Sequence, residues 1–274
     1  FRNAESTYFK DGRAPVAGEL FTNPDLADTL SLIAGEGSEA FYSGAIAETI
    51  DSYMRAIDGD LRYADLKAHR GEWVEPLGVE YKGYTLYELP PNGQGVAALM
   101  MLSILKNVDL SQWDRGSPEV FHYLVEAKRL AFADMAASFA DPDFSVAPLE
   151  RLISDEYGKQ QFERINPKRA AVDYGPSAAV LEGEGDTTYL TVADKTGMMV
   201  SLIQSNYRGM GSGLVPTGLG FMLQDRGELF ALNPEHPNAY QPGKRPFQTI
   251  IPAFLMKGDV PVTSFGLMGG GMQP

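Results

Sequence analysis

The most constraining feature of this sequence is a change in its periodicity at Asp186. Before this residue, apolar positions recur mostly at helical spacing, most clearly from Val120 to Phe139. After it, segments rich in Thr, Val, Ile and Tyr are separated by turn residues, which is typical of β-strands. A mainly helical portion followed by a strand-rich portion predicts an α+β chain.

The portion before Asp186 contains recognisable start and stop signals. Asn23 is a typical helix N-cap, Pro24 suits the first helical position, and Gly35 is expected to end that helix. Alternating residues around a Lys82-Gly83 turn predict a hairpin that leads into the loop LPPNGQG. The predicted elements are helices over 24–34, 38–57, 120–139 and 148–165, a hairpin over 79–89, a helix stop at 141–142 and a linker over 166–185.

The portion after Asp186 begins with a second predicted hairpin. Its strands are Thr187 to Ala193 and Met198 to Ser205, and its turn is Asp194 to Gly197. Further strands are expected over 219–223, 249–256 and 260–265, close to glycine-rich loops. This portion is therefore predicted to form a sheet.

Charge and residue usage exclude several classes of function. The chain has 36 acidic and 23 basic residues, and its net charge of −13 repels nucleic acid and anionic membrane surfaces. No apolar run approaches the roughly 20 residues that span a bilayer, so a soluble chain is expected. Cysteine is absent, and His69, His122 and His236 lie too far apart for a metal-ligand motif, so no metal site is expected.

Both ends of the sequence look cut. The first residue is Phe1 rather than Met, and the last stretch, GGGMQP, stops directly after an apolar run. Any signal peptide would have lain upstream. Cytoplasmic, periplasmic and secreted locations therefore all stay open.

The segment GDTTYLTVADKTG places Thr187 and Thr188 at the start of a strand, directly after an acidic, glycine-rich linker. A cut before Thr187 would make its hydroxyl a nucleophile. Its freed α-amine, with a pKa of about 7.7 to 8.0, would serve as the general base. Judged by this spacing alone, Thr187 and Thr188 are more often ordinary strand residues than catalytic ones.

An ordered series of motifs carries a family resemblance over nearly the whole chain. TTYLTVADKTG is followed by SNYRGMGSGLVPTGLGFMLQDRG, NPEHPNAYQPGKRPFQTIIP and FGLMGGG. It is preceded by NPDLADTL, FYSG, LPPNGQG and EAKRLAFADMAASFADPDF. In this order the motifs resemble the γ-glutamyltransferase family of N-terminal-nucleophile hydrolases, from the end of the large subunit into the small subunit.

The resemblance implies a fold and a set of catalytic residues. The implied fold is the four-layer αββα sandwich preceded by a mainly helical portion, with residues 1–186 in the large-subunit region and 187–274 in the small-subunit region. Thr187 would be the nucleophile, released when the chain divides after Asp186. Ser205 corresponds to a hydroxyl residue that hydrogen-bonds the nucleophile. Gly269 and Gly270 correspond to the pair whose N–H groups form the oxyanion hole.

The positions that bind the substrate in the family are occupied differently here. An asparagine, a glutamine and an aspartate hold the γ-glutamyl α-amino and α-carboxylate groups, and the alignment places Leu229 at the aspartate. The alignment also places Tyr207 and Arg226 at the other two positions, and their neighbours Asn206 and Asp225 would substitute if the register shifts by one residue. Leucine cannot hold an ammonium group. The candidate substrate-binding residues are Asn206, Tyr207, Arg226, Gln248 and Thr249.

The resemblance implies a threonine amidohydrolase or acyltransferase that acts on γ-glutamyl amides such as glutathione and needs no cofactor. Leu229 and the short segment from Phe230 to Lys244 leave open an acylase for bulkier amides, and Arg208 and Arg226 would suit a glutaryl group, as in the related cephalosporin acylases. A non-catalytic, uncleaved relative is a further alternative. The expected partners are an amide or peptide substrate and the protein's own cleaved subunits; assembly into a homodimer stays open.

Overall fold

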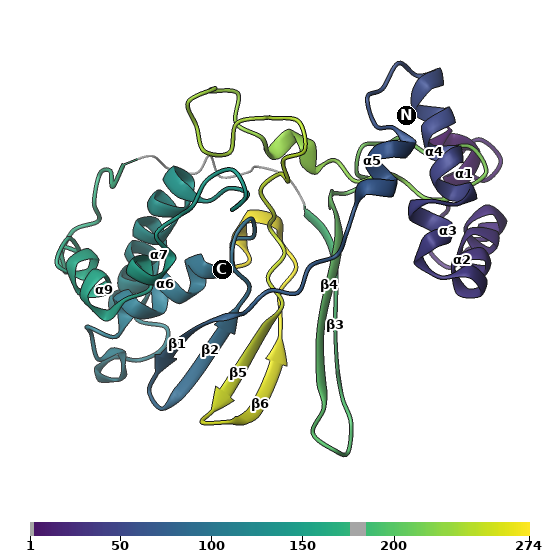
Figure 1. Ribbon diagram of the computed structural model, residues 1–274. Coiled ribbons are helices and arrows are strands. Elements are labelled where there is room, and N and C mark those ends of the chain that lie inside the picture. Colours follow the sequence, from purple (N-terminus) through teal and green to yellow (C-terminus); the bar gives the residue numbers. More distant parts are fainter. Residues whose placement is uncertain (1–2, 176–184) are drawn as a thin grey trace. The chain divides into compact units, whose positions relative to one another are not determined.

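The computed structural model describes residues 3–175 and 185–274, which form two compact units (Figure 1). A helical unit comprises Phe1–Trp73 and Gly209–Asp225. A sheet unit comprises Val74–Arg208 and Arg226–Pro274.

The helical unit packs short helices around Ala40, Ile46, Ile50 and Leu219. The Asn23 side chain accepts a hydrogen bond from the Leu26 N–H, which confirms the predicted N-cap. The helices are α1 (Ala4–Tyr8), α2 (Pro24–Glu36), α3 (Ser38–Tyr42), α4 (Ala45–Ala56) and α5 (Tyr63–Ala68).

Two helix boundaries in this unit differ from the prediction. Gly35 lies inside α2. The helix ends at Glu36, and its C-cap Gly37 has a φ of 75°, in the left-handed region that favours glycine. The single helix predicted over 38–57 is interrupted between α3 and α4. At the interruption, a Cβ on Gly44 would lie 3.0 Å from the Ala40 Cα, so the chain turns where only glycine fits comfortably.

The strand predicted over 219–223 is wrong, because this segment packs on α2 as a loop. Gly218 and Gly220 have φ values of 78° and 71°, which a strand does not adopt. The backbone carbonyl of Leu219 accepts from the Thr29 hydroxyl at 2.9 Å, and that of Gly220 accepts from the Asn23 side chain at 2.7 Å. The backbone groups therefore bond to α2 instead of to a neighbouring strand.

The sheet unit is built on an antiparallel sheet with the strand order β1-β2-β5-β6. The predicted hairpin over 79–89 is confirmed, with Lys82 and Gly83 at its turn. Leu86 of β2 pairs with Leu255 of β5, which joins the portion before Asp186 to the portion after it. The strands are β1 (Leu77–Tyr81), β2 (Tyr84–Glu88), β5 (Ala253–Lys257) and β6 (Val260–Phe265).

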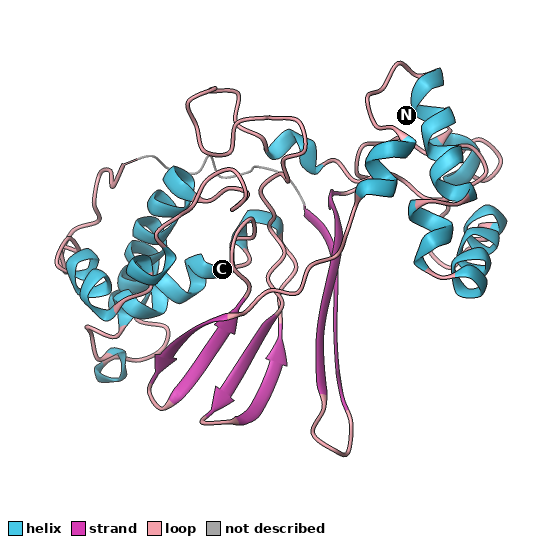
Figure 2. Ribbon diagram, in the orientation of Figure 1, coloured by secondary structure: helices cyan, strands magenta, loops and turns pink. Residues whose placement is uncertain are grey.

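Helices cover one face of this sheet (Figure 2). Leu99 packs with the sheet residue Leu86, while Met100 packs with Met135 of the next helix, so the first helix is buried on both sides. Burying each such side chain contributes about 1.5–3 kcal/mol. The helices are α6 (Gly95–Leu105), α7 (Pro118–Ser138), α8 (Leu149–Leu152) and α9 (Asp155–Phe162), with the short η1 (Leu110–Gln112) between α6 and α7.

The long helix predicted over 120–139 is confirmed as α7, whose N-cap Ser117 accepts from the Val120 N–H. It ends at Ser138, before the predicted stop at Asp141. The helix predicted over 148–165 is two helices, because Ser154 caps a new start by accepting from the Tyr157 N–H at 3.1 Å. Of the linker predicted over 166–185, residues 176–184 lie outside the described residues.

The second predicted hairpin is confirmed as β3 (Gly185–Ala193) and β4 (Met199–Arg208), which pair antiparallel. The Thr191 hydroxyl hydrogen-bonds to the Ser264 hydroxyl of β6, so the hairpin lies beside the sheet (Figure 1). The observed architecture is therefore mixed α+β, with a helical N-terminal part and antiparallel sheets. Across residues 3–175 and 185–274, no helix combines the length and hydropathy needed to cross a membrane.

Candidate active site

Thr187 and Ser205 face each other across the β3–β4 hairpin. The Thr187 hydroxyl donates to the Ser205 Oγ at 3.0 Å, and the Thr187 side chain is buried. The same Ser205 oxygen accepts from the Tyr207 N–H at 2.8 Å. The predicted nucleophile and its predicted hydroxyl partner are thus brought together, because the hairpin register places them opposite each other.

The pairing of the hairpin shifts between Asp186 and Thr187. Asp186 pairs with Tyr207 and Thr187 with Ser205, so Asn206 is an additional residue in β4. Tyr207 has a φ of 78°, an uncommon value for a bulky residue. Bulges re-aim side chains near functional sites, and this one lies opposite the peptide bond where cleavage was predicted. The side chain of Asp186 lies outside the described residues.

Tyr207, Arg226 and Thr249 form a cluster. Arg226 begins η2 (Arg226–Leu229), is 3% exposed, and donates from Nη1 to the Thr249 Oγ1 at 3.0 Å. Its Cζ lies 5.4 Å from the centroid of the Tyr207 ring, within cation–π range. Arg208, the other predicted basic residue, pairs with Glu228 at 2.5 Å on the surface, and its Cζ lies 5.9 Å from the centroid of the same Tyr207 ring. The structure therefore brings only Arg226 to Thr249.

Gln248 and Thr249 are held by the loop LPPNGQG. The Gln248 N–H donates to the Asn92 carbonyl at 2.8 Å, and the Asn92 side chain donates to the Pro246 carbonyl. Gln94 donates to the Thr249 carbonyl at 2.6 Å and to the Gly270 carbonyl at 2.9 Å. Sequence reasoning noted this loop as a family motif but did not assign Gln94, because no local pattern reveals a contact with residues so distant in the chain.

Gly269 and Gly270, the predicted oxyanion-hole pair, lead into η3 (Gly270–Met272), which lies against β3. Their φ values are 143° and 55°, both in the region that favours glycine. Gly270 is buried, and its carbonyl accepts from the Gln94 side chain and from the Gln273 N–H. The pair therefore lies in the part of the sheet unit next to the strand that carries Thr187.

His122 and Leu229 make contacts that the sequence does not specify. His122 Nε2 hydrogen-bonds to the Asn166 carbonyl at 2.8 Å, and Glu126, on the same helix, accepts from the Tyr174 hydroxyl at 2.5 Å. Leu229 is buried, and its carbonyl accepts from the Asn238 side chain. Within the described residues, no group of carboxylates and histidines could hold a metal ion.

A buried carboxyl group lies beside the loop that carries Gln94. Glu88, at the end of β2, is 3% exposed, and a Cβ added to Gly95 would lie 2.7 Å from its Oε2. Burial raises the pKa of Glu88 to about 8. The group is therefore mostly protonated at neutral pH.

Glu88 makes folding stability depend on pH. Its pKa is higher in the folded chain than its ordinary value of 4.5. The contribution of Glu88 to stability is therefore fully present at low pH and is lost as the pH rises from about 5 to about 8, with a slope of up to about 1.4 kcal/mol per pH unit. Glu88→Gln should remove this slope. Urea unfolding across this range is the measurement, with the exposed Glu75→Gln as control. Equal slopes in wild type and Glu88→Gln would contradict the assignment.

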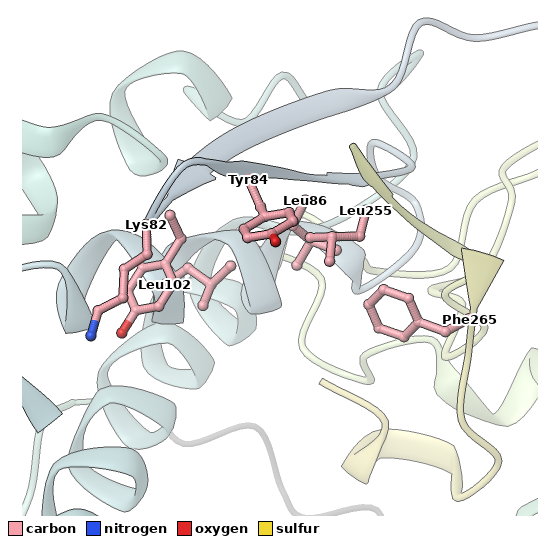
Figure 3. Close-up of a pocket in the computed structure, with 7 residues that line it drawn as sticks. Lys82, Tyr84, Leu86, Leu102, Leu255 and Phe265 are labelled. Atoms are coloured by element: carbon pink, nitrogen blue, oxygen red, sulfur yellow. The ribbon is translucent and has the colours of Figure 1, made fainter. Parts of the chain in front are cut away.

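A separate apolar pocket of about 250 Å³ lies between the sheet and α6 (Figure 3). None of the predicted site residues lines it, so we do not assign it to the candidate site. Its lining residues are Tyr81, Lys82, Tyr84, Leu86, Leu102, Leu255 and Phe265.

Comparison with known proteins identifies the family of this arrangement. The family model described as Gamma-glutamyltranspeptidase matches residues 1–274. The chain is 41% identical to the Glutathione hydrolase-like YwrD proenzyme of Bacillus subtilis over 267 residues, which cover 97% of this chain and 50% of that protein. It is 35% identical to the Oxamate amidohydrolase proenzyme of Klebsiella pneumoniae, covering 98% of this chain and 49% of that protein.

A solved structure, the cephalosporin acylase from Bacillus halodurans, matches with a TM-score of 0.91 and 41% sequence identity. The match covers 98% of this chain and 48% of that one. The chain thus spans about half the length of the relatives it matches.

Proposed function

The chain belongs to the gamma-glutamyltranspeptidase family, and from this membership we propose that it is part of a self-processing threonine amidohydrolase or acyltransferase. The observation that carries the proposal is the hydrogen bond from the Thr187 hydroxyl to Ser205, at the start of a strand that follows an acidic, glycine-rich segment. Thr187 is the nucleophile, and no cofactor takes part.

Processing begins when the Thr187 Oγ attacks the carbonyl carbon of Asp186. The peptide C–N bond breaks as the ester C–O bond forms, and the Thr187 nitrogen takes up the proton. Water then hydrolyses the ester, which leaves a carboxylate on Asp186 and a free hydroxyl and α-amine on Thr187. The bulge at Asn206 supports this step, since it interrupts regular pairing beside the bond that breaks.

Catalysis uses the freed threonine. The α-amine takes the hydroxyl proton as the Oγ attacks the substrate amide carbon, and Ser205 orients the hydroxyl. The N–H groups of Gly269 and Gly270 stabilise the oxyanion of the tetrahedral intermediate. The α-ammonium then gives its proton to the leaving amine as the C–N bond breaks. Water or an acceptor amine releases the acyl group from Thr187.

We further propose that processing divides the protein into two subunits that stay together. Residues 1–186 belong to the large subunit and residues 187–274 to the small subunit. The pairing of β2 with β5 supports continued association, because each strand comes from a different side of the cut. The complete catalytic fold would then be the αββα four-layer sandwich.

The proposed substrates are γ-glutamyl amides such as glutathione. One relative is named a glutathione hydrolase-like proenzyme, which supports this class. Asn206, beside Ser205 in the bulge, and Gln248 and Thr249, held by the LPPNGQG loop, are the proposed polar contacts for the glutamyl group.

A second candidate is an acylase for glutaryl-type or bulkier amides. The buried Arg226 beside Thr249 favours it, because a guanidinium group suits a carboxylate on the acyl chain. Leu229 at the position of the family's aspartate favours it as well, since leucine cannot bind the ammonium group that distinguishes glutamyl from glutaryl. The likeness to a cephalosporin acylase agrees with this alternative.

Hydrolysis of γ-glutamyl and glutaryl anilides by the full-length protein distinguishes these candidates. The γ-glutamyl proposal expects a kcat/KM at least about 10-fold higher for the γ-glutamyl compound, which corresponds to about 1.4 kcal/mol of transition-state binding. The reverse preference would support the acylase. Equal inertness towards both compounds, in a folded sample, would favour a non-catalytic relative with a binding or structural role.

A further inference from the structure

Gln94 lies buried between two segments of the candidate active site. Its side chain is fully buried. Its Nε2 donates to the Thr249 carbonyl at 2.6 Å and to the Gly270 carbonyl at 2.9 Å. Thr249 is a proposed substrate contact and Gly270 is a proposed oxyanion-hole residue, so one amide group joins both parts of the site.

The chemistry of these partners fixes the orientation of the Gln94 amide. Both partners are carbonyl oxygens, which only accept hydrogen bonds, and the amide nitrogen carries two hydrogens. A flipped amide would set its oxygen against two other oxygens and leave them without these donors. The side chain is therefore held in one orientation with both of its N–H groups in use.

The two ends of this link differ in rigidity. Gln94 is the N-cap of α6, whose side chains are buried against the sheet and against α7. Gly269, Gly270 and Gly271 have no side chains to hold them, and glycine has wide backbone freedom. A donor on a rigid helix therefore limits the positions that the glycine loop can take.

We propose that Gln94 is a positioning residue for the oxyanion hole. It holds the carbonyl of Gly270 at a constant separation from Thr249 and thereby limits the positions of the backbone that carries the Gly269 and Gly270 N–H groups. Thr249 also accepts from Arg226, so the link extends to the substrate-binding cluster. The inference rests on the proposed function, since it assigns Gln94 to the same reaction.

Replacing Gln94 tests this role through the rate rather than through substrate binding. In Gln94→Met, kcat for the anilide that the wild type cleaves faster should fall by about 10- to 100-fold, since a displacement of about 1 Å can cost 100-fold and loss of one oxyanion donor about 100- to 1000-fold. KM should change by less than about threefold. Each rate is divided by the concentration of processed protein, which is determined from the intact masses in the sample.

A buried glutamine outside the site provides the matched control. Gln161 of α9 is 4% exposed and donates from Nε2 to the Asp134 carboxylate at 2.9 Å and to the Tyr157 hydroxyl at 2.6 Å. Gln161→Met should therefore lower the unfolding midpoint about as much as Gln94→Met and leave kcat within about twofold of wild type. Equal kcat losses in the two variants would overturn the proposal.

A second variant keeps the test decisive if Gln94→Met does not fold. Gln94→Glu has the same size, but its ionised form, which is favoured as the pH rises, sets a carboxylate against two carbonyl oxygens. A protonated carboxyl restores one donor, so its kcat relative to wild type should rise as the pH falls. A constant ratio close to one would overturn the proposal. An inert wild type would instead overturn the proposed function and this inference with it.

Discussion

Thr187→Ala should lower the rate of amide hydrolysis by about 10⁴-fold or more, since removal of a covalent nucleophile leaves only binding and oxyanion stabilisation. The variant keeps the backbone of β3 and loses the hydroxyl that donates to Ser205 together with the γ-methyl group. Thr187→Ser, which retains a hydroxyl, should keep measurable activity. Steady-state hydrolysis of the anilide that the wild type cleaves faster is the measurement.

The neighbouring threonine is a close control for this experiment. Thr188 follows Thr187 in β3, and its side chain is exposed. Because successive side chains of a strand point to opposite faces, Thr188→Ala should leave the rate within about threefold of wild type. Comparable activity in Thr187→Ala and Thr188→Ala would exclude Thr187 as the nucleophile.

Asp141→Ala should lower the free energy of unfolding by about 3 kcal/mol, since it removes a buried charged acceptor from a pair whose other member is only partly buried. The Asp141 carboxylate accepts from the Arg245 N–H at 2.7 Å and from its Nη2 at 2.9 Å, and thereby ties the end of α7 to the segment before Gln248. Removing it leaves both donors without this acceptor. Denaturant unfolding with a fitted midpoint and slope is the measurement.

Asp143, the neighbouring acidic residue, distinguishes the effect of burial on stability from the effect of charge. Asp143 also pairs with Arg245, but its side chain is 71% exposed, so Asp143→Ala should cost less than about 1 kcal/mol. Burial alone would raise the pKa of Asp141, but hydrogen bonds from Arg245 lower it below its ordinary value. The stabilisation should therefore be present at neutral pH and lost as the pH falls through this lowered pKa. Equal losses in both variants would contradict the account.

Elements specified by neighbouring residues could be predicted from the sequence. The β3–β4 hairpin follows from its turn at Asp194 to Gly197 and its strand composition, and α7 follows from its apolar spacing. The strand expected over 219–223 failed because Gly218 and Gly220 take left-handed conformations that favour packing on α2. Local patterns do not report such contacts with distant segments.

The candidate site was predicted as a set of residues and not as an arrangement. Family resemblance named Thr187 and Ser205, and the hairpin register brings them together. It could not separate Arg226, which bonds to Thr249, from Arg208, which pairs on the surface. It also could not find Gln94, since its partners lie more than 150 positions away in the chain.

The intact mass of the full-length gene product after incubation, beside a Thr187→Ala variant, tests the central claim most directly. The proposed self-processing predicts that the wild type divides into two fragments after Asp186 and that Thr187→Ala keeps a single undivided mass. The new N-terminus of the second fragment should be Thr187, with an α-amine free for labelling. A single undivided mass for both proteins, in folded samples, would contradict the account and leave a family member without this nucleophile.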